Sequence, residues 1–581
     1  MVIPATGAHD NVGGSRATDR EFLLVGALLA GALMIGLATA SDYGISIDEF
    51  NADDYGPKAL NWYTSGFTDR SHFETVEFSL WYYGPWFHML TSFVQSFDLA
   101  ARFTVRHAMT FLIGLGGLAA LLPIGRLAVG RWVGLTAISL CLMTGYLYGS
   151  LFVTPIDVPF LAAMTWATLA ILVMSQQVLP SWSATVAVGI TTGLAIATRT
   201  GGIITHVYLI GALVLCATEF YAVNGRLTGR YLLQLGARYA AVSAIAVVIA
   251  IVLWPWLQVG NPLKQFMIAY RHFGTIPMSY EFSHWGERVR TDALPTFYIP
   301  AQLGARLPDL FIFLLAIAVV GGAISAAKRA FDLWASSRTD RRARLLALAM
   351  SIASQRGILI VSAAVIFPIG VLIIQRTKLY DGIRHVLFVI PMLAIIAGGG
   401  FTILLPLLRR VKFVFLMVAG LWAGNVVVTL AMLHPLEYVA MNTLAGGTRG
   451  AYGRFEHDYL AVAATEAVRR LESRLQYEQL AGNSNAKPPS ILICIPWREW
   501  AVAPLLTRPW RLDTDVDKAD FVIETERWRC ASDRGLHLID EVKRFDRPYA
   551  WTYARKAEFN LDTLGSELMH SAVQRAGKKI E

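Results

Sequence analysis

The chain has 581 residues, of which 55% are hydrophobic and 16% are charged, and its formal net charge is +9. This composition is too apolar for a water-soluble protein of that length and indicates a polytopic membrane protein. The positive charge is accounted for by basic loops between apolar segments, so it does not require a nucleic-acid partner.

Windows of apolar residues recur along most of the chain, up to residue 432. A membrane-spanning helix needs roughly 20 such residues, and about eleven windows qualify. They are 22–40, 108–125, 133–151, 159–178, 183–198, 203–222, 240–257, 309–327, 357–374, 386–404 and 413–432. We therefore predict an all-α membrane region over residues 22–433, preceded by a cytoplasmic tail of residues 1–21.

The short loops predict the orientation of these spans. Arg16 and Arg20 precede the first span, and every second loop after it is also basic. Since basic loops stay on the cytoplasmic side, the N-terminus is expected in the cytoplasm. The acidic segment 42–77 then lies outside, and an odd number of spans places the C-terminus outside as well.

Two long outer loops interrupt the pattern, at residues 41–107 and 258–308. Both are rich in aromatic and turn residues, among them Trp81, Trp86 and Trp285. Amphipathic aromatic side chains favour the headgroup level of a bilayer, so the first loop is predicted to form short interfacial helices. The second loop is long and has no apolar face of its own, which is more typical of a functional segment.

From residue 434 to 581 the composition becomes that of a water-soluble domain. One segment has helical periodicity and two have strand-like composition: 460–480, 490–495 and 520–524. We therefore predict a small α/β domain on the outer face. Cys494 and Cys530 both fall within it, where an oxidising compartment would allow a disulfide, but sequence alone leaves their separation open.

Candidate functional side chains gather at the outer ends of the spans. An ionisable residue in a membrane helix costs about 2.5 to 3.5 kcal/mol to insert, so it needs a partner or a role. The residues singled out on this basis are Asp48, Glu49, Asp157, Arg199, Arg271, Lys378, Arg384 and His385. Carboxylates and cations that converge at one membrane face predict a site for a substrate with a phosphate and a hydroxyl.

Several motifs that include these residues resemble one group of membrane enzymes. The motifs are Asp48-Glu49, Pro155–Pro159, Gly193–Gly202, Trp254-Pro-Trp256, Tyr380–His385 and the segment 446–459. Their order and their shared side resemble the membrane glycosyltransferases of the GT-C class. The resemblance is to bacterial relatives of protein O-mannosyltransferases and of the lipid A aminoarabinose transferase in particular, and it covers most of residues 20–460.

The resemblance implies the fold, the reaction and the location. It implies a GT-C-like membrane domain in a bacterial inner membrane, with the domain of residues 434–581 in the periplasm. The donor would be a sugar on a polyprenyl-phosphate carrier, and the acceptor a lipid, a glycan or a protein at the outer face. Transfer in a single displacement would invert the configuration of the sugar.

Roles for the candidate residues follow from this reaction. Asp48 is expected to be the base that takes the proton of the acceptor hydroxyl. Glu49 and Asp157 would orient the acceptor, tune Asp48 or hold a divalent cation, and whether a metal is needed stays open. A departing phosphate needs cations as negative charge develops on it. The residues expected to bind it are Arg199, Arg271, Lys378, Arg384 and His385.

Other interpretations of these residues stay open. Asp48, Glu49 and Asp157 could serve as helix caps, and Arg199 could extend towards lipid headgroups. In place of a transferase, the chain could be a transporter or flippase, although its sequence shows no internal repeat of the kind common in transporters. A third alternative keeps the fold but makes the enzyme a glycan ligase or polymerase that uses a diphosphate carrier.

Overall fold

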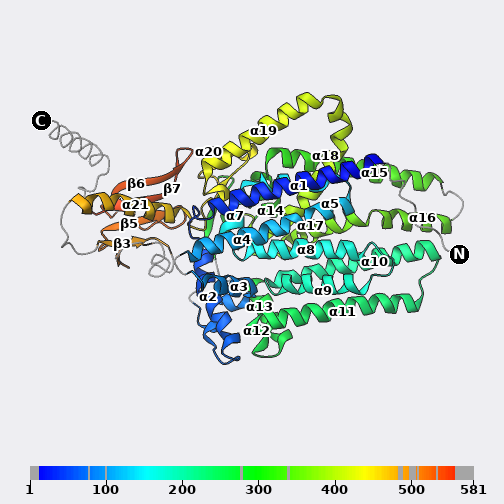
Figure 1. Ribbon diagram of the computed structural model, residues 1–581, viewed down its shortest axis with the longest axis horizontal. Coiled ribbons are helices and arrows are strands. Elements are labelled where there is room, and N and C mark those ends of the chain that lie inside the picture. Colours follow the sequence, from blue (N-terminus) through cyan, green and yellow to red (C-terminus); the bar gives the residue numbers. More distant parts are fainter. Residues whose placement is uncertain are drawn as a thin grey trace.

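The computed structural model describes residues 12–75, 79–98, 101–274, 279–336, 341–481, 489–495, 506, 510–531 and 534–555. Long helices lie side by side through most of the molecule, and a small sheet lies beyond one end of them (Figure 1). Of the predicted tail 1–21, residues 1–11 lie outside the described residues, and the rest belong to α1 (Val12–Thr39).

All but one of the helices of the membrane region follow the apolar windows of the sequence, and residues 341–354 form a helix between two windows. They are α1, α4 (Arg102–Ala119), α5 (Leu121–Ala128), α6 (Val133–Leu142), α7 (Gly145–Val153), α8 (Asp157–Met174), α9 (Trp182–Ile196), α10 (Thr205–Asn224), α11 (Gly229–Leu253), α15 (Asp309–Ser336), α16 (Arg341–Ser354), α17 (Arg356–Ile374), α18 (Ile390–Arg410) and α19 (Lys412–Leu433). Within the described residues, nine helical stretches are long and apolar enough to cross a membrane. Each matches a predicted window, so the all-α membrane architecture is confirmed.

The other two windows differ from simple spans. Window 133–151 covers α6 and α7, which are bent by 70° at the break between them. Window 183–198 falls on α9, whose 15 residues are fewer than the roughly 20 that a span needs. Gly189 and Gly193, one turn apart on α9, bring this helix close to α11, since a Cβ at either position would lie within 2.7 Å of an isoleucine Cβ.

Burial separates central helices from peripheral ones. In the apolar windows of α8 and α18, 83% and 67% of the residues are buried inside the molecule. The corresponding share is 11% for α1 and 0% for α19, so these two helices present their apolar side chains to the surroundings. The start of α8 therefore places its first residue, Asp157, in the centre of the bundle end.

The two outer loops fold into short elements at one end of the bundle. The first contains α2 (Ile47–Thr64), η1 (Ser71–Phe73), η2 (Leu80–Tyr82) and α3 (Trp86–Gln95), so short helices are present there as predicted. The second contains α13 (Pro262–Gly274), the antiparallel hairpin of β1 (Glu281–His284) and β2 (Glu287–Arg290), and α14 (Tyr298–Arg306), and α12 (Pro255–Gln258) directly precedes it. In Figure 1, α2, α3, α12 and α13 lie together at the end that faces the sheet.

Short helical turns also connect the long helices at this end and lead towards the sheet. They are η3 (Thr200–Ile204), η4 (Arg384–Val389), η5 (Glu437–Val439), η6 (Thr443–Ala445) and α20 (Gly447–Ala451). Two of these turns adjoin predicted site residues. Arg199 directly precedes η3, and Arg384 is the first residue of η4. The irregular backbone between spans is thus where the candidate residues gather.

The described C-terminal residues form an α/β unit. Its strands are β3 (Ser490–Ile493), β4 (Arg511–Leu512), β5 (Phe521–Thr525), β6 (His537–Arg544) and β7 (Arg547–Ala554), in the order β4-β3-β5-β7-β6. β3 runs parallel to β4 and β5, and β7 runs antiparallel to β5 and β6. The helix α21 (Ala463–Ala481) packs against β5, β6 and β7. The sequence predicted α21, β3 and β5, but not the other three strands.

A disulfide joins Cys494 and Cys530. It connects the residue that follows β3 to the loop that follows β5, two neighbouring parallel strands. The sequence left this pairing open, and the structure supplies it. Cys141 and Cys216 are free and buried among the membrane helices.

Candidate functional site

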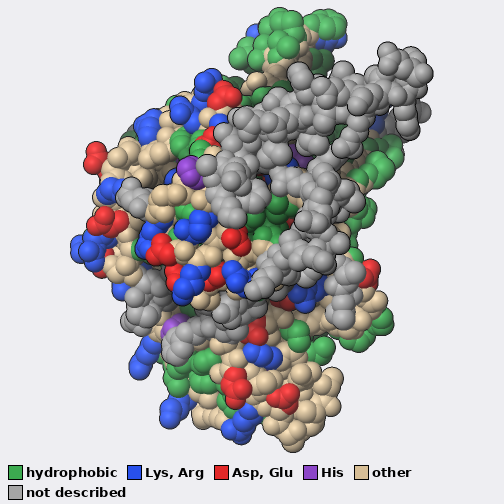
Figure 2. Space-filling model, turned by 90° about the vertical axis from the view of Figure 1, so that its left-hand side faces the viewer, with side chains coloured by type: hydrophobic (Ala, Val, Ile, Leu, Met, Phe, Trp, Pro, Cys, Tyr) green, Lys and Arg blue, Asp and Glu red, His purple; other side chains and the backbone are tan. Residues whose placement is uncertain are grey.

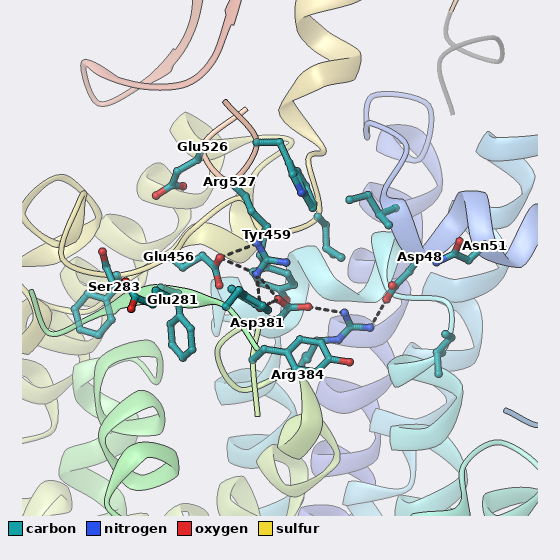
Figure 3. Close-up of a pocket in the computed structure, with 18 of the residues that line it drawn as sticks. Asp48, Asn51, Glu281, Ser283, Asp381, Arg384, Glu456, Tyr459, Glu526 and Arg527 are labelled. Atoms are coloured by element: carbon teal, nitrogen blue, oxygen red, sulfur yellow. Dashed lines mark hydrogen bonds and ion pairs between the residues drawn. The ribbon is translucent and has the colours of Figure 1, made fainter. Parts of the chain in front are cut away.

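A cavity of about 920 Å³ lies where the outer loops meet the C-terminal sheet. Segments far apart in the chain line it: α2, β1, the turn before η4, residues 452–460 and the loop after β5. Figure 2 views the molecule from the end that carries the sheet, where acidic and basic side chains are intermixed. Figure 3 shows the charged side chains that line the cavity and the ion pairs between them.

The first carboxylates of the site stand at the start of α2. Ser46 caps this helix: its Oγ accepts a hydrogen bond from the Glu49 N–H (3.2 Å), and the Glu49 carboxylate accepts one from the Ser46 N–H (2.9 Å). This capping box turns Glu49 away from the cavity, and Glu49 Oε1 lies 3.0 Å from His107 Nε2. Asp48 points into the cavity instead. Adjacent acidic residues therefore face different surroundings.

Arg384 lies at the centre of the site (Figure 3). Its Nε lies 3.2 Å from Asp157 Oδ2, its Nη1 lies 2.7 Å from Asp381 Oδ2, and its Nη2 pairs with Asp48. Each nitrogen of this one guanidinium therefore holds a different carboxylate. Charge-assisted contacts of this kind are among the stronger hydrogen bonds in proteins.

The turn before Arg384 requires glycine. Asp381 and Gly382 have φ angles of 60° and 66°, in the left-handed region. A Cβ at Gly382 would also lie 2.9 Å from Nη2 of Arg306. Arg306 is buried, lies over the Tyr146 ring with its Cζ 4.6 Å from the centroid, and donates a hydrogen bond of 3.0 Å to a backbone carbonyl oxygen. This packing fixes the turn that presents Asp381 to Arg384.

Asp157 and Arg199 extend the network on the side of the helices. Asp157 is 1% exposed, and its Oδ1 lies 2.7 Å from Nη2 of Arg199. The Arg199 guanidinium carbon also lies 5.5 Å from the centroid of the Tyr83 ring. Asp157 is thus bound by two cations, Arg199 and Arg384, and is absent from the cavity lining.

The C-terminal unit contributes Arg527, from the loop after β5. Arg527 pairs with Asp381 and, at 2.7 Å, with Glu456. Its Nη2 also donates to the Tyr280 hydroxyl (3.0 Å), which in turn donates to Asp381 Oδ1 (3.2 Å). Figure 3 shows Asp381 between Arg384 and Arg527, so an arginine of the membrane region and one of the sheet share a carboxylate.

Burial and neighbouring charges set the protonation of two carboxyl groups of the cavity. Burial, with the charges of Asp157 and Asp381, raises the pKa of Asp48 to about 6 against the opposing charge of Arg384. Burial also acts to raise the pKa of Asp381, but the guanidiniums of Arg527 and Arg384 outweigh it and hold this pKa below the usual value. Asp48 is therefore the stronger base of the two.

The structure brings four of the predicted residues into one ion-pair network: Asp48, Asp157, Arg199 and Arg384. His385 follows Arg384, and its ring centroid lies 4.7 Å from that of Tyr380. Glu49 takes the helix-capping position instead of facing the cavity. Arg271, on α13, and Lys378, before the turn, are not among the residues that line the cavity. Their role in phosphate binding stays a prediction.

Sequence reasoning gave no role to Asp381, Glu456 or Arg527, which complete the network. Asp381 stood in the predicted Tyr380–His385 motif, and its carboxylate next to Arg384 was an available signal. Arg527 lies three residues after the strand-like run 520–524, and charged side chains in the loop after a buried strand are often functional. The sequence could not show that Arg527 pairs with Asp381, because 146 residues separate the two.

Whether a divalent cation is needed, which the sequence left open, stays untested. Among the residues that the structure describes, no group of three or more His, Cys, Asp or Glu side chains is arranged to hold a metal ion. The three carboxylates nearest the centre surround the guanidinium of Arg384.

Comparisons with known proteins gave matches only among solved structures. No family model and no curated protein matches the chain. ArnT from Cupriavidus metallidurans, bound to undecaprenyl phosphate, is 16% identical over 92% of this chain and 98% of its own, with a TM-score of 0.41. The oligosaccharyltransferase AglB from Archaeoglobus fulgidus, in complex with an inhibitory peptide and a dolichol-phosphate, is 10% identical over 86% and 69%, with a TM-score of 0.39.

A third match is the arabinofuranosyltransferase AftD from mycobacteria. It is 11% identical over 91% of this chain and 40% of its own, with a TM-score of 0.38. All three matches are at most 16% identical to this chain and have TM-scores below 0.5. The reaction is proposed below from the residues of this chain.

Proposed function

We propose that this chain is an inverting glycosyltransferase of the GT-C class that moves a sugar from a polyprenyl-phosphate carrier to an acceptor hydroxyl. The donor class is the one implied by the sequence motifs. The carrier chain would lie among the apolar helices, with its phosphate at the cavity. The acceptor, a lipid, glycan or protein, would enter beside the sheet. The membrane would be a bacterial inner membrane, with the sheet in the periplasm.

The observation that supports this reaction best is the position of Asp48. Of the three carboxylates that Arg384 holds, Asp157 is also bound by Arg199, and Asp381 is also bound by Arg527. Within the described residues Arg384 is the single ion-pair partner of Asp48, which lines the cavity and has its pKa raised to about 6. A carboxylate that is buried, singly held and weakly acidic is suited to act as a general base near neutral pH.

The ion pairs suggest how the donor would engage. A phosphate that approaches Arg384 has to displace one of its carboxylates, because each of the three nitrogens already holds one. Asp48 would be displaced most easily, since it loses contact with only one cation. Binding of the donor would therefore free the base, and Arg384 would take up the negative charge of the phosphate.

The chemical step then needs no further group to balance it. The acceptor oxygen attacks the anomeric carbon of the sugar and forms the new glycosidic bond on one face. The bond between that carbon and the phosphate oxygen breaks on the opposite face, which inverts the configuration. The acceptor proton passes to Asp48, and the bonding electrons leave with the polyprenyl phosphate, whose charge Arg384 stabilises.

Native mass spectrometry of the mildly solubilised protein tests this proposal. We expect a polyprenyl phosphate or its glycosylated form to remain bound to the parent and to be lost from Arg384→Gln. Arg409→Gln is the matched control, because Arg409 lies exposed in the last turn of α18, the helix that follows the η4 turn begun by Arg384. The mass of the retained lipid would identify the sugar.

Two outcomes would contradict the proposal. If only bulk phospholipid is bound, or if Arg384→Gln and the parent retain the same lipids, the phosphate site is misassigned and a transporter or flippase becomes the better interpretation. If a polyprenyl diphosphate is retained instead, the chain belongs with the ligases or polymerases that use such carriers.

A further inference from the structure

The loop that carries Arg527 is fixed at both of its ends. It leaves β5, whose five residues are all buried in the middle of the sheet. It ends at Cys530, which the disulfide joins to Cys494 beside the neighbouring strand β3. The Glu524 carboxylate also accepts a hydrogen bond of 2.6 Å from the Cys530 N–H. Few conformations are therefore open to residues 526–529.

The same loop is bound to segment 456–458, which borders the cavity, by its first residue. The Glu526 carboxylate accepts hydrogen bonds from the backbone N–H groups of His457 (3.3 Å) and Asp458 (3.1 Å). These residues directly follow Glu456, the second carboxylate that Arg527 holds. Two neighbouring contacts therefore hold the loop at the cavity. Glu526 accepts from the backbone of residues 457–458, and Arg527 pairs with Glu456.

These contacts determine which carboxylate can leave Arg384. With Arg527 in place, Asp381 is held by two cations, and Asp48 by one. Without Arg527, Arg384 would be the one ion-pair partner left to Asp381 among the described residues, as it is for Asp48. A donor phosphate could then displace Asp381 more readily than in the parent, although the Tyr280 hydroxyl would still donate to it. Asp48 would then stay paired with Arg384 in a fraction of the complexes. The donor would bind, but fewer bound donors would react.

We propose that Arg527 is a positioning residue that keeps Asp381 on Arg384 so that the donor releases Asp48, and that the Cys494–Cys530 disulfide holds the loop that presents it. This inference rests on the function proposed above. It assigns the sheet a role in the chemistry of the cavity, and it makes transfer dependent on the redox state of one cysteine pair.

Reduction of the disulfide would release the loop at one end. A dithiol such as dithiothreitol gives two electrons and two protons, the S–S bond breaks, and Cys494 and Cys530 become thiols while the dithiol closes into a cyclic disulfide. Removing this cross-link enlarges the set of conformations open to the loop, because it closes a segment of sequence separation 36. Arg527 would then spend less time on Asp381.

The test uses membrane vesicles that contain the full-length chain and the glycosylated polyprenyl phosphate that mass spectrometry has identified. Release of free polyprenyl phosphate is the readout. For Arg527→Met we expect kcat to fall about tenfold or more, while the KM for the donor changes by less than about threefold. Arg527→Lys should recover part of kcat, since a lysine keeps the charge but not the forked geometry. Arg534→Met is the matched surface control, because Arg534 pairs with exposed Asp517.

A second experiment leaves Arg527 intact. Dithiothreitol should lower kcat of the folded parent, and Cys494→Ala/Cys530→Ala should show a similar lowered kcat that dithiothreitol no longer changes. The double variant Cys141→Ala/Cys216→Ala should respond to dithiothreitol as the parent does, since these thiols are not disulfide-bonded. Thermal unfolding checks that each variant is folded, and if Arg527→Met is not, Arg527→Lys and the reduced parent decide.

The outcomes separate this inference from the function on which it rests. A parent that neither retains the donor nor releases polyprenyl phosphate overturns the proposed function and this inference with it. A parent that is active, together with an Arg527→Met variant whose kcat lies within about twofold of it, overturns the positioning role alone. Unchanged turnover after complete reduction overturns the role of the disulfide.

Discussion

The two ends of the ion-pair network are built from the same residue types but are held differently. At the end formed by α2, Asp48 meets one guanidinium and open cavity. At the end formed by the sheet, Asp381 meets two guanidiniums and the Tyr280 hydroxyl. The number of partners decides which carboxylate can move, since each additional ion pair has to be broken before the group is free. The comparison therefore predicts chemistry at the α2 end and positioning at the sheet end.

The strongest test of this comparison removes the charge at the α2 end. We expect Asp48→Asn to lower kcat by roughly 10²–10⁴-fold, because an amide cannot accept the acceptor proton. The variant should still retain the donor lipid in native mass spectrometry, since Arg384 is unchanged. Asp54→Asn is the matched control on the same helix, where Asp54 pairs with Lys58 at 2.7 Å. Normal turnover by a folded Asp48→Asn variant would show that Asp48 is not the base.

The pH dependence of kcat/KM provides the second test. Since burial raises the pKa of Asp48 to about 6, this group is a carboxylate above that pH and becomes protonated below it. A base has to be unprotonated, so we expect kcat/KM to be constant near neutral pH and to fall about tenfold per pH unit below about 6. A profile that stays flat down to pH 5 would contradict this assignment.

Glu49, the residue next to Asp48, allows a third test, which separates stability from catalysis at the α2 end. It completes the capping box with Ser46 and pairs with His107. We expect Glu49→Gln to lower the free energy of unfolding by about 1–2 kcal/mol, through weaker capping and the loss of this pair, with little effect on kcat. Thermal unfolding and kcat, measured on the same preparation, would show the two effects separately. A large loss of kcat without a loss of stability would instead place Glu49 in the chemistry.

The smallest expected effect is that of Asp381, at the sheet end of the network, on the pKa of Asp48, at the α2 end. The negative charge of Asp381 contributes to the raised pKa of Asp48. We therefore expect Asp381→Asn to lower that pKa and to move the acidic limb of the kcat/KM profile towards lower pH by a fraction of a pH unit. The profiles of parent and variant, fitted over the same pH range, would reveal this shift. Movement towards higher pH would show that Asp381 acts on Asp48 in another way.

Much of the membrane region could be predicted from the sequence, because the length of an apolar window is nearly sufficient to define a span. Window 183–198 shows the limit of this rule, since α9 is too short and depends on the close approach of α11 at Gly189 and Gly193. The spacing of Ser46 and Glu49 also carried the capping-box signature, so the helix-capping position of Glu49 could have been recognised before the structure.

The partners within the site could be predicted only in part. Asp48 and Arg384 stood out because charged residues at the edge of an apolar span need a reason to be there. Their pairing across 336 residues depends on how α2 and η4 are placed by the fold, as does the arrival of Arg527 from the sheet. The pattern of residues in a helix or strand indicates which of its faces is buried. It does not show which distant element packs against that face, and the contacts of this site join such distant elements.

The packing of Gly382 against Arg306 has a consequence for how this protein can change over evolutionary time. Any side chain at position 382 would collide with the guanidinium that lies 2.9 Å from the glycine's missing Cβ, and would also have to accept a φ angle of 66°. A lineage that acquires a side chain there would have to shift the Arg306 guanidinium away from the turn or replace Arg306 by a smaller residue. Substitution of Gly382 is therefore expected to be rare among descendants of this chain.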